Sequence, residues 1–170
     1  MRMANTFLYF AYGSNMLSRR LQRRTPSAWP IGTGFVEAHR LTFDKVSSDG
    51  SGKCNIESRS NPSDRVYGVL FSIKRDEAND LDEAEGLGSG YRKTEVRVVS
   101  PTGVHIAVAY IADRTNPLLR PYEWYKEFVV RGAIEHKLPA VYVRRLQITE
   151  SQRDSNERRR TRNEAVLAEK

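Results

Sequence analysis

The sequence contains one cysteine, Cys54, and three histidines, so the residue types that build disulfides and transition-metal sites are scarce. A single cysteine excludes an internal disulfide and a cysteine-cluster metal site, which leaves Cys54 as an ordinary reduced thiol. His39, His105 and His136 lie far apart in the sequence and have no ligand spacing with one another or with carboxylates. We therefore expect no protein-bound transition metal.

Long apolar runs are missing as well, and none approaches the roughly 20 residues that a transmembrane helix needs. The apolar run at residues 7–10 is too short for the core of a secretory signal, and no small-residue cleavage site follows it. With 170 residues, 39% of them hydrophobic and 29% charged, the chain has the size and composition of one compact globular domain. We expect a cytoplasmic protein with no membrane partner.

Basic residues are abundant, and the formal net charge of +7 is the feature that suggests an anionic partner. Arginines cluster in residues 19–24 and again in residues 158–162. The second cluster lies among Asp154, Glu157 and Glu164 and has no interleaved aromatic ring that could stack a base. This pattern is typical of a solvated helix or a frayed terminus, so nucleic acid is not the expected partner.

The first half of the chain reads as strands and short helices. Residues 7–11 predict a buried strand that Gly13 ends, and a helix with Leu17 and Leu21 on one face follows, capped by Ser14 or Asn15. That helix ends near residues 25–26. Residues 35–43 predict another strand, residues 47–52 a polar loop and residues 66–73 a further strand.

The second half predicts a helix, a hairpin and two more helices. Asp76 is expected to cap a helix with Ala78, Leu81 and Ala84 on one face, and Gly86 to end it. Residues 94–99 and 104–112 flank a turn and predict a β-hairpin. Residues 121–138 are helical up to the breaker Pro139, and a last helix starts at Ala140. The expected core residues in these elements are Val104, Ile106, Val108, Tyr110, Trp124, Phe128, Val129 and Leu146.

The segment from Tyr12 to Met16 joins a strand to a helix through a glycine. Such a turn places unpaired backbone N–H groups at the positive end of the helix dipole, where a carboxylate or a developing oxyanion can bind. Gly13 permits close backbone approach, and Ser14 and Asn15 add polar side chains. Most junctions of this kind are structural, so the pattern alone gives a candidate site and no more.

Glu85 lies in the last turn of its predicted helix, with Asp82 one turn earlier and Glu83 beside it. A carboxylate at the negative end of a helix is disfavoured by roughly 0.3 to 1 kcal/mol at the surface, and the like charge adds to this. Both effects favour the protonated form, which would make Glu85 a better base than a free glutamate if it lies in a pocket. Acidic helix ends also occur by chance in charged proteins.

Tyr110, Ser14 and Cys54 are further candidates for a chemical role. Tyr110 is expected to bury its ring, with its hydroxyl bonded to a backbone carbonyl by default or to a substrate in the functional alternative. Ser14 has no histidine near it in sequence and lacks the Gly-x-Ser-x-Gly spacing of a nucleophile elbow. A thiol pair of Cys54 with His39 or His105 has no supporting pattern.

Four segments taken together resemble the gamma-glutamylcyclotransferase family, which is related in fold to the plant AIG2-like proteins. They are FLYFAYGSNM at residues 7–16, LDEAEG at 81–86, GSGY at 88–91 and AYI at 109–111. The resemblance spans residues 7–146, although residues 45–63 have no clear counterpart. It implies an α+β fold, a small mixed β-barrel flanked by helices, in a single domain 1–150 followed by a charged C-terminal tail or helix 151–170.

The resemblance also implies a reaction, the cyclisation of the gamma-glutamyl group of an amide or peptide to release 5-oxoproline and a free amine. It assigns catalysis to Glu85 and no metal or organic cofactor. Substrate binding falls to one loop and two tyrosines, namely Tyr12, Gly13, Ser14, Asn15, Met16, Tyr110 and Tyr125. A homodimer is in keeping with the resemblance, and the identity of the amine stays open.

Two alternatives remain at this point. The first is a non-catalytic AIG2-like module that binds a small acidic metabolite or a protein partner, and it predicts ligand-induced thermal stabilisation without turnover. The second is a basic nucleic-acid binder that uses the two arginine clusters, and it predicts salt-dependent binding to DNA or RNA.

Overall fold

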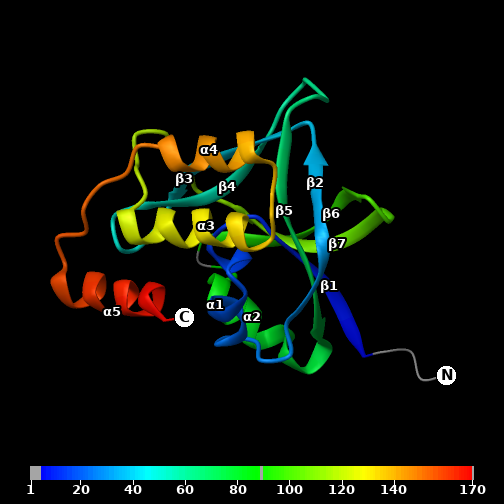
Figure 1. Cartoon of the computed structure of the whole chain (residues 1–170), viewed down its shortest axis with the longest axis horizontal. Helices are drawn as coiled ribbons and strands as arrows, with labels where there is room; N and C mark the ends of the chain where they lie inside the picture. Colours follow the sequence, from blue (N-terminus) through cyan, green and yellow to red (C-terminus); the bar gives the residue numbers. More distant parts are fainter. Residues whose placement is uncertain (1–4, 89, 170) are drawn as a thin grey trace.

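A computed structural model describes residues 5–88 and 90–169 and shows a β-barrel beside a group of helices (Figure 1). The strands are β1 (Thr6–Ala11), β2 (Trp29–Glu37), β3 (His39–Val46), β4 (Gly52–Ser58), β5 (Arg65–Lys74), β6 (Tyr91–Ser100) and β7 (Gly103–Ala112). The helices are α1 (Ser18–Gln22), α2 (Ala78–Glu85), α3 (Glu123–Glu135), α4 (Ala140–Ile148) and α5 (Glu157–Ala168), with short 3-10 turns at Ser14–Met16 and Arg75–Glu77. None of the helices among the described residues has the length and apolar character needed to cross a bilayer.

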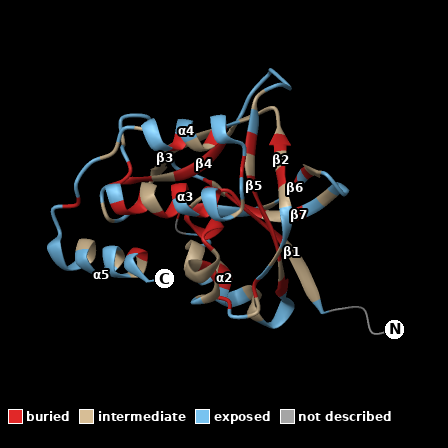
Figure 2. Ribbon diagram, in the orientation of Figure 1, coloured by how far each residue is buried: buried red, intermediate tan, exposed pale blue. Residues whose placement is uncertain are grey.

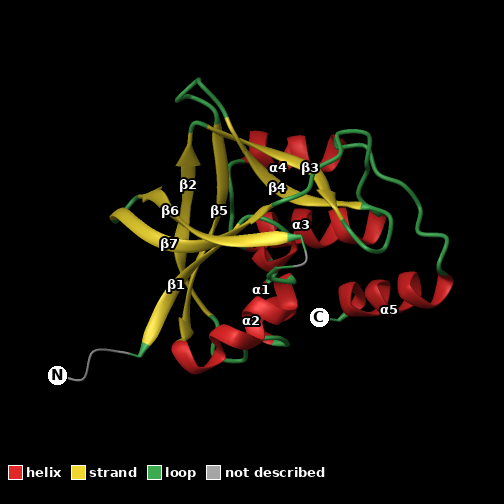
Figure 3. Cartoon of the chain, turned by 180° about the vertical axis from the view of Figure 1, so that it is seen from behind, coloured by secondary structure: helices red, strands yellow, loops and turns green. Residues whose placement is uncertain are grey.

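The barrel closes in the order β1-β5-β2-β6-β7. Neighbouring strands are antiparallel except at the seam, where β1 and β7 run parallel and Tyr9 pairs with Val108. Strands β3 and β4 form a separate two-stranded sheet that lies toward α3 and α4 when the molecule is seen from behind (Figure 3). The expected α+β fold with a small mixed barrel flanked by helices is confirmed.

The main core lies between the barrel and α3, where buried positions of both elements face one another (Figure 2). Phe128 and Val129 of α3 are fully buried and Trp124 is nearly so, as predicted from the sequence. Gly132 of α3 packs directly against the backbone of the segment that follows β1, since a Cβ at Gly132 would lie 2.5 Å from the backbone nitrogen of Leu17. This close approach, which only glycine permits, fixes the position of the segment that follows β1.

Several local predictions are wrong. Residues 35–43 are two strands, because Ala38 adopts a left-handed conformation with φ of 54° and turns the chain. Strand β4 was not predicted at all. Neither of the two expected caps, Ser14 or Asn15 for the first helix and Asp76 for the second, is found. Helix α1 begins after Leu17 and α2 after Glu77, and neither helix has a side-chain cap.

The hairpin β6–β7 is confirmed, but its expected apolar face is partly wrong. Val104 is 50% exposed and Ile106 57%, because the tip of the hairpin extends beyond the helices that could cover it (Figure 1). The buried set on β7 includes Ala107 and Ala109 instead. Tyr110 is nevertheless buried, since α2 covers this end of the strand and its Asp82 accepts the Tyr110 hydroxyl.

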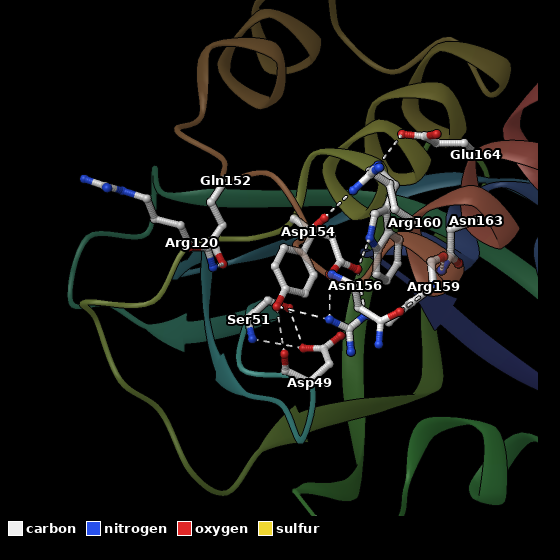
Figure 4. A network of polar contacts seen from close by, with 12 residues as sticks. Asp49, Ser51, Arg120, Gln152, Asp154, Asn156, Arg159, Arg160, Asn163 and Glu164 are labelled. Carbon is white, nitrogen blue, oxygen red and sulfur yellow. Dashed lines mark hydrogen bonds and ion pairs between the residues drawn. The ribbon is translucent and has the colours of Figure 1, made fainter.

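The segment after residue 150 is tied to the body by a polar network (Figure 4). Asp154 is buried and accepts hydrogen bonds from Trp124 Nε1 at 2.9 Å and from Arg159 at 2.6 Å. At the other end of α5, the carbonyl oxygen of Leu167 accepts from Arg19 of α1 and Arg131 of α3. The chain after α4 therefore lies against α1 and α3 at both ends of α5.

Candidate active site

A narrow cavity lies where β1 leaves the barrel and the C-terminal end of α2 approaches it. Its volume is about 30 Å³, and its lining is Tyr9, Tyr12, Gly13, Ser14, Asn15, Cys54, Glu85, Tyr91, Tyr110 and Tyr125. A larger groove of about 680 Å³ lies between β3, β5 and α4, but it includes none of the residues expected to do chemistry. The small cavity is therefore the candidate site.

The turn after β1 forms one wall of the cavity. Gly13 has an ordinary negative φ, but a Cβ there would lie 3.0 Å from Cys54 Cβ and 3.4 Å from the Tyr125 hydroxyl. A side chain at this position would therefore crowd β4 and α3. The backbone then makes a 3-10 turn in which the Met16 N–H bonds to the Gly13 carbonyl at 3.0 Å. The first N–H groups of such a turn have no partner within it, and here these are the backbone N–H groups of Ser14 and Asn15.

Glu85 forms the opposite wall. It is the last residue of α2, which Gly86 ends with a φ of 67°, the left-handed conformation expected at a helix terminus. The Tyr9 hydroxyl donates to Glu85 Oε1 at 3.1 Å, and Asn15 Nδ2 donates to the same oxygen. The side chain of the turn and the carboxylate of α2, 70 residues apart in sequence, are thus in direct contact.

Burial raises the pKa of Glu85 above its usual value. The positive charge of Arg24, the Tyr9 hydrogen bond and the charges of Arg20 and Lys45 act in the opposite direction. The expected direction is confirmed, but the expected cause is wrong. Asp82 is not among the largest effects on Glu85, and its carboxylate instead accepts from the Tyr110 hydroxyl and from Lys93 Nζ at 3.1 Å.

Four tyrosine side chains bond to the backbone or to other residues of the site. Tyr12 donates to the Tyr110 carbonyl oxygen across the β1–β7 seam, and Tyr110 donates to Asp82, a carboxylate rather than the backbone carbonyl that was the default expectation. Tyr91 donates to the Cys54 carbonyl at 2.7 Å, and the Tyr125 oxygen accepts from the Cys54 N–H at 3.0 Å. Burial raises the pKa of each of these hydroxyls, so they stay neutral.

Cys54 lines the cavity but remains a protonated thiol. Burial is the largest of the effects that raise its pKa to about 12. A thiol that stays protonated is a poor nucleophile. In addition, no group of three or more histidine, cysteine, aspartate and glutamate side chains among residues 5–88 and 90–169 is arranged to hold a metal ion.

The structure brings together most of the residues singled out from the sequence. Tyr12 to Asn15, Glu85, Tyr110 and Tyr125 all line the cavity, whereas Met16 is fully buried behind the turn and faces Gly132. Tyr9, Cys54 and Tyr91 also line the cavity but were not predicted as site residues. Tyr9 and Tyr91 lie inside the quoted motifs and could have been found there, but Cys54 lies on the unpredicted strand β4.

The arginines of residues 19–24 contact the protein itself. Arg20 places its guanidinium carbon 4.2 Å from the centroid of the Phe128 ring, and burial with the neighbouring charge of Arg24 lowers its pKa to about 10. Arg23 pairs with Glu169, and Arg24 Nη1 donates to Asn15 Oδ1 at 3.1 Å. Arg20, Arg23 and Arg24 are therefore engaged in contacts within the protein. That nucleic acid is not a partner stays a prediction.

Comparison with known proteins gives a consistent result. Residues 65–146 match the model of the AIG2-like family. The chain is 34% identical over 150 residues to the human gamma-glutamylcyclotransferase, covering 85% of this chain and 79% of the relative, and 33% identical over the same length to the mouse protein. A solved structure of a gamma-glutamyl cyclotransferase superimposes with a TM-score of 0.83 at 29% identity, covering 94% of this chain and 99% of that one. The chain therefore belongs to the gamma-glutamylcyclotransferase family.

Proposed function

We propose that this protein is an enzyme that cyclises the gamma-glutamyl group of a small-molecule amide or peptide, releasing 5-oxoproline and a free amine. The observation that carries the proposal is the direct contact between Glu85 and Asn15, because it joins a carboxylate to an anion-binding turn in one cavity. The names of the human and mouse relatives support the same activity. Nothing favours a non-catalytic binding module on this fold.

The substrate supplies its own nucleophile, since attack of its α-amine on its γ-carbonyl closes a five-membered ring. The α-ammonium must first lose a proton, and Glu85 is the base that takes it. Both hydrogen bonds found on this carboxylate among the described residues go to Oε1, which leaves Oε2 to receive the proton. The raised pKa of Glu85 brings its basicity closer to that of an ammonium under physiological conditions.

Collapse of the tetrahedral intermediate breaks the bond between the γ-carbon and the amine. Two protons leave the attacking nitrogen in the overall reaction, and both end on the departing amine. Glu85 delivers the one it has taken, so a single group acts first as base and then as acid. Such a role typically contributes about 10²- to 10⁴-fold to the rate.

The N–H groups of Ser14 and Asn15 are suited to the substrate's α-carboxylate or to the oxyanion of the intermediate. Tyr12, Tyr110 and Tyr125 surround the reacting carbons and hold the glutamyl chain in its folded conformer. Because the cavity has a volume of only about 30 Å³, these side chains must move apart slightly to admit the glutamyl group. No step in this scheme requires a metal or an organic cofactor.

The test is a mass-spectrometric scan of gamma-glutamyl amino acids, gamma-glutamyl dipeptides including glutathione, and gamma-glutamyl alkylamines for 5-oxoproline formation. Wild type should act on at least one class, and Glu85→Gln should lower the rate by about 10²- to 10⁴-fold, because the amide cannot accept the proton. The circular dichroism spectrum of the variant should match that of wild type. Full activity in Glu85→Gln would remove Glu85 from the mechanism.

The remaining assignments are part of the same proposal. We place the catalytic unit in residues 1–150 and treat residues 151–170 as a tail with no part in the chemistry. A cytoplasmic location and a homodimer fit this assignment, and sedimentation of the purified protein would settle the oligomeric state. A gel-shift experiment with DNA and RNA at low and high salt checks that nucleic acid does not bind.

A further inference from the structure

Arg24 does not line the cavity, but its charged side chain contacts Asn15, which does. It follows Arg23, the C-cap of α1, and its backbone N–H bonds to the Leu21 carbonyl at 2.9 Å. Its side chain turns toward the site, and Nη1 donates to the Asn15 side-chain oxygen at 3.1 Å. Asn15 is buried and donates in turn to Glu85. A chain of two hydrogen bonds therefore connects Arg24 to the catalytic carboxylate.

The orientation of the Asn15 amide depends on this chain. The two ends of an asparagine side chain have nearly the same shape, and only their hydrogen-bond partners distinguish them. Arginine has five donors and no acceptor, so the amide oxygen must face Arg24. The NH₂ group then faces Glu85 Oε1 and lies 3.2 Å from the Tyr9 oxygen. Tyr9 cannot impose this orientation alone, since a hydroxyl both donates and accepts.

Arg24 becomes decisive when Glu85 is protonated. An ionised carboxylate accepts only, and it would by itself attract the NH₂ group of Asn15. Once Glu85 carries a proton it can also donate, and an Asn15 amide free to rotate could then turn its oxygen toward that proton. The proton would be held on Oε1 by an internal hydrogen bond, away from the departing amine. Arg24 prevents the rotation because its donors keep the amide oxygen engaged in both states.

We propose that Arg24 is a positioning residue for the reaction, because it locks Asn15 with its NH₂ group toward Glu85 Oε1 and thereby keeps the transferred proton on Oε2. The inference rests on the proposed function, in which Glu85 alternates between base and acid. The charge of Arg24 also opposes the rise of the Glu85 pKa that burial causes, and it is the largest of the opposing effects. Arg24 thus affects both the oxygen of Glu85 that holds the proton and the affinity of Glu85 for that proton.

The chain offers matched variants for a test. Arg24→Met keeps the length of the side chain but removes every donor and the charge, whereas Arg24→Lys keeps a donor-only, charged group. Arg23→Met makes the same change at the adjacent residue, whose side chain is exposed and pairs with Glu169. If Arg24→Met does not fold, Arg24→Gln, a neutral side chain that can both donate and accept, is measured instead.

Two measurements separate positioning from a general loss of structure. The first is a ¹³C NMR titration of the glutamate side-chain carboxyls in the free protein, in which Glu85→Gln identifies the Glu85 signal. The second is the pH dependence of kcat/KM for 5-oxoproline formation. Arg24→Met should raise the pKa of Glu85, move the acid limb of the profile to higher pH by the same amount and lower kcat at neutral pH about tenfold. Arg24→Lys should recover most of this loss, and Arg23→Met should match wild type.

A double-mutant cycle with Asn15→Ala tests the route. If Arg24 acts through Asn15, the loss of kcat in the double variant should be smaller than the product of the two separate losses. Independent effects would overturn the proposed route, and an Arg24→Met protein with the wild-type pKa and pH profile would overturn the inference altogether. The titration needs no turnover, so a wild type that forms no 5-oxoproline would refute the proposed function without deciding the pKa effect.

Discussion

Two carboxylates of this molecule, Glu85 and Asp154, are held by the protein in opposite ways. Asp154 is paired with a cation, since Arg159 contacts both of its carboxylate oxygens at 2.6 Å (Figure 4). Trp124 Nε1 and the Asn156 N–H donate two further hydrogen bonds to the same carboxylate. The Arg159 pair holds the pKa of Asp154 well below its usual range. Glu85 instead accepts from the neutral groups of Tyr9 and Asn15, and burial raises its pKa.

The difference separates an acid with a structural role, Asp154, from the acid to which we assign the proton transfer, Glu85. A carboxylate that is paired directly with an arginine cannot take up a proton at neutral pH, so Asp154 serves to attach the segment before α5 to α3. The cation with the largest effect on Glu85, Arg24, bonds to Asn15 and not to the carboxylate itself. That arrangement keeps the carboxylate ordered while leaving it able to exchange a proton.

The largest stability effect should come from Asp154→Asn. This change removes the charge partner of Arg159 in a partly buried pair, in which the Arg159 side chain is 24% exposed. Such a loss costs about 2 kcal/mol and lowers the melting temperature of a chain of this size by about 4 to 8 °C. Thermal unfolding followed by circular dichroism measures the loss. The kcat of the folded protein at 25 °C should stay within about twofold of wild type, since Asp154 lies outside the cavity lining.

Glu164→Gln is the matched control for that change, because Glu164 is exposed and its contact with Arg160 is 3.9 Å long. Its melting temperature should equal that of wild type within about 2 °C. A loss of activity without a loss of stability in Asp154→Asn would contradict the division between the two acids and would connect the tail to the chemistry.

A smaller, catalytic effect is expected for Tyr9→Phe. The change removes the hydroxyl that donates to Glu85 Oε1 at 3.1 Å and leaves the buried ring in place. Because this hydrogen bond lowers the pKa of Glu85, its loss should move the acid limb of kcat/KM to higher pH and reduce the neutral rate by about tenfold. Tyr142→Phe, which removes a hydroxyl 3.4 Å from the Tyr67 carbonyl, should leave the profile unchanged.

The smallest effect concerns stability and has the opposite sign to that of Asp154→Asn. Because the pKa of Glu85 is raised on folding, its ionised form is less favourable in the folded protein than in the unfolded chain, and stability falls as pH rises through the folded pKa. Glu85→Gln should therefore increase the melting temperature at pH 7, by about 2 °C. The gain should vanish at pH values below the range in which free glutamate titrates.

For Asp154 the pH dependence runs the other way. Its lowered pKa supplies stability above the normal range of aspartate, and this contribution is lost as the pH falls toward the depressed value. Melting curves of wild type, Glu85→Gln and Asp154→Asn between pH 3 and 8 would show both trends. If Glu85→Gln were less stable than wild type at pH 7, Glu85 would be a structural acid like Asp154.

The sequence was sufficient for those parts of the site that local rules determine. The turn at Gly13 and the helix end at Glu85 follow from a glycine after a strand and from Gly86 after an amphipathic run, and both are found where expected. The pKa of Glu85 illustrates the limit of such rules. Its direction was predicted from the helix end and Asp82, but the largest cause is burial by segments that are distant in the sequence.

Contacts between distant segments account for the errors. The hydroxyl of Tyr110 was assigned to a backbone carbonyl, because only the packing of α2 on β7 shows that Asp82 is within reach. Val104 and Ile106 alternate like core residues, yet they belong to the part of the hairpin that nothing covers. The role of Arg24 could not be inferred either, since a run of arginines on a short helix has no pattern that separates a surface charge from one directed at Asn15.

The seam of the barrel has one more consequence. Tyr9 and Val108, which are paired where β1 meets β7, are almost a hundred positions apart along the chain, and the Tyr12 hydroxyl bonds to the carbonyl of Tyr110 across the same line. During synthesis, a nascent chain that ends before β7 already contains the turn at Gly13 and the carboxylate of Glu85. It lacks the strand that closes the barrel beside them. Under the proposed mechanism, activity therefore requires that β7 has been synthesised, and a product terminated before β7 would be inactive rather than partly active.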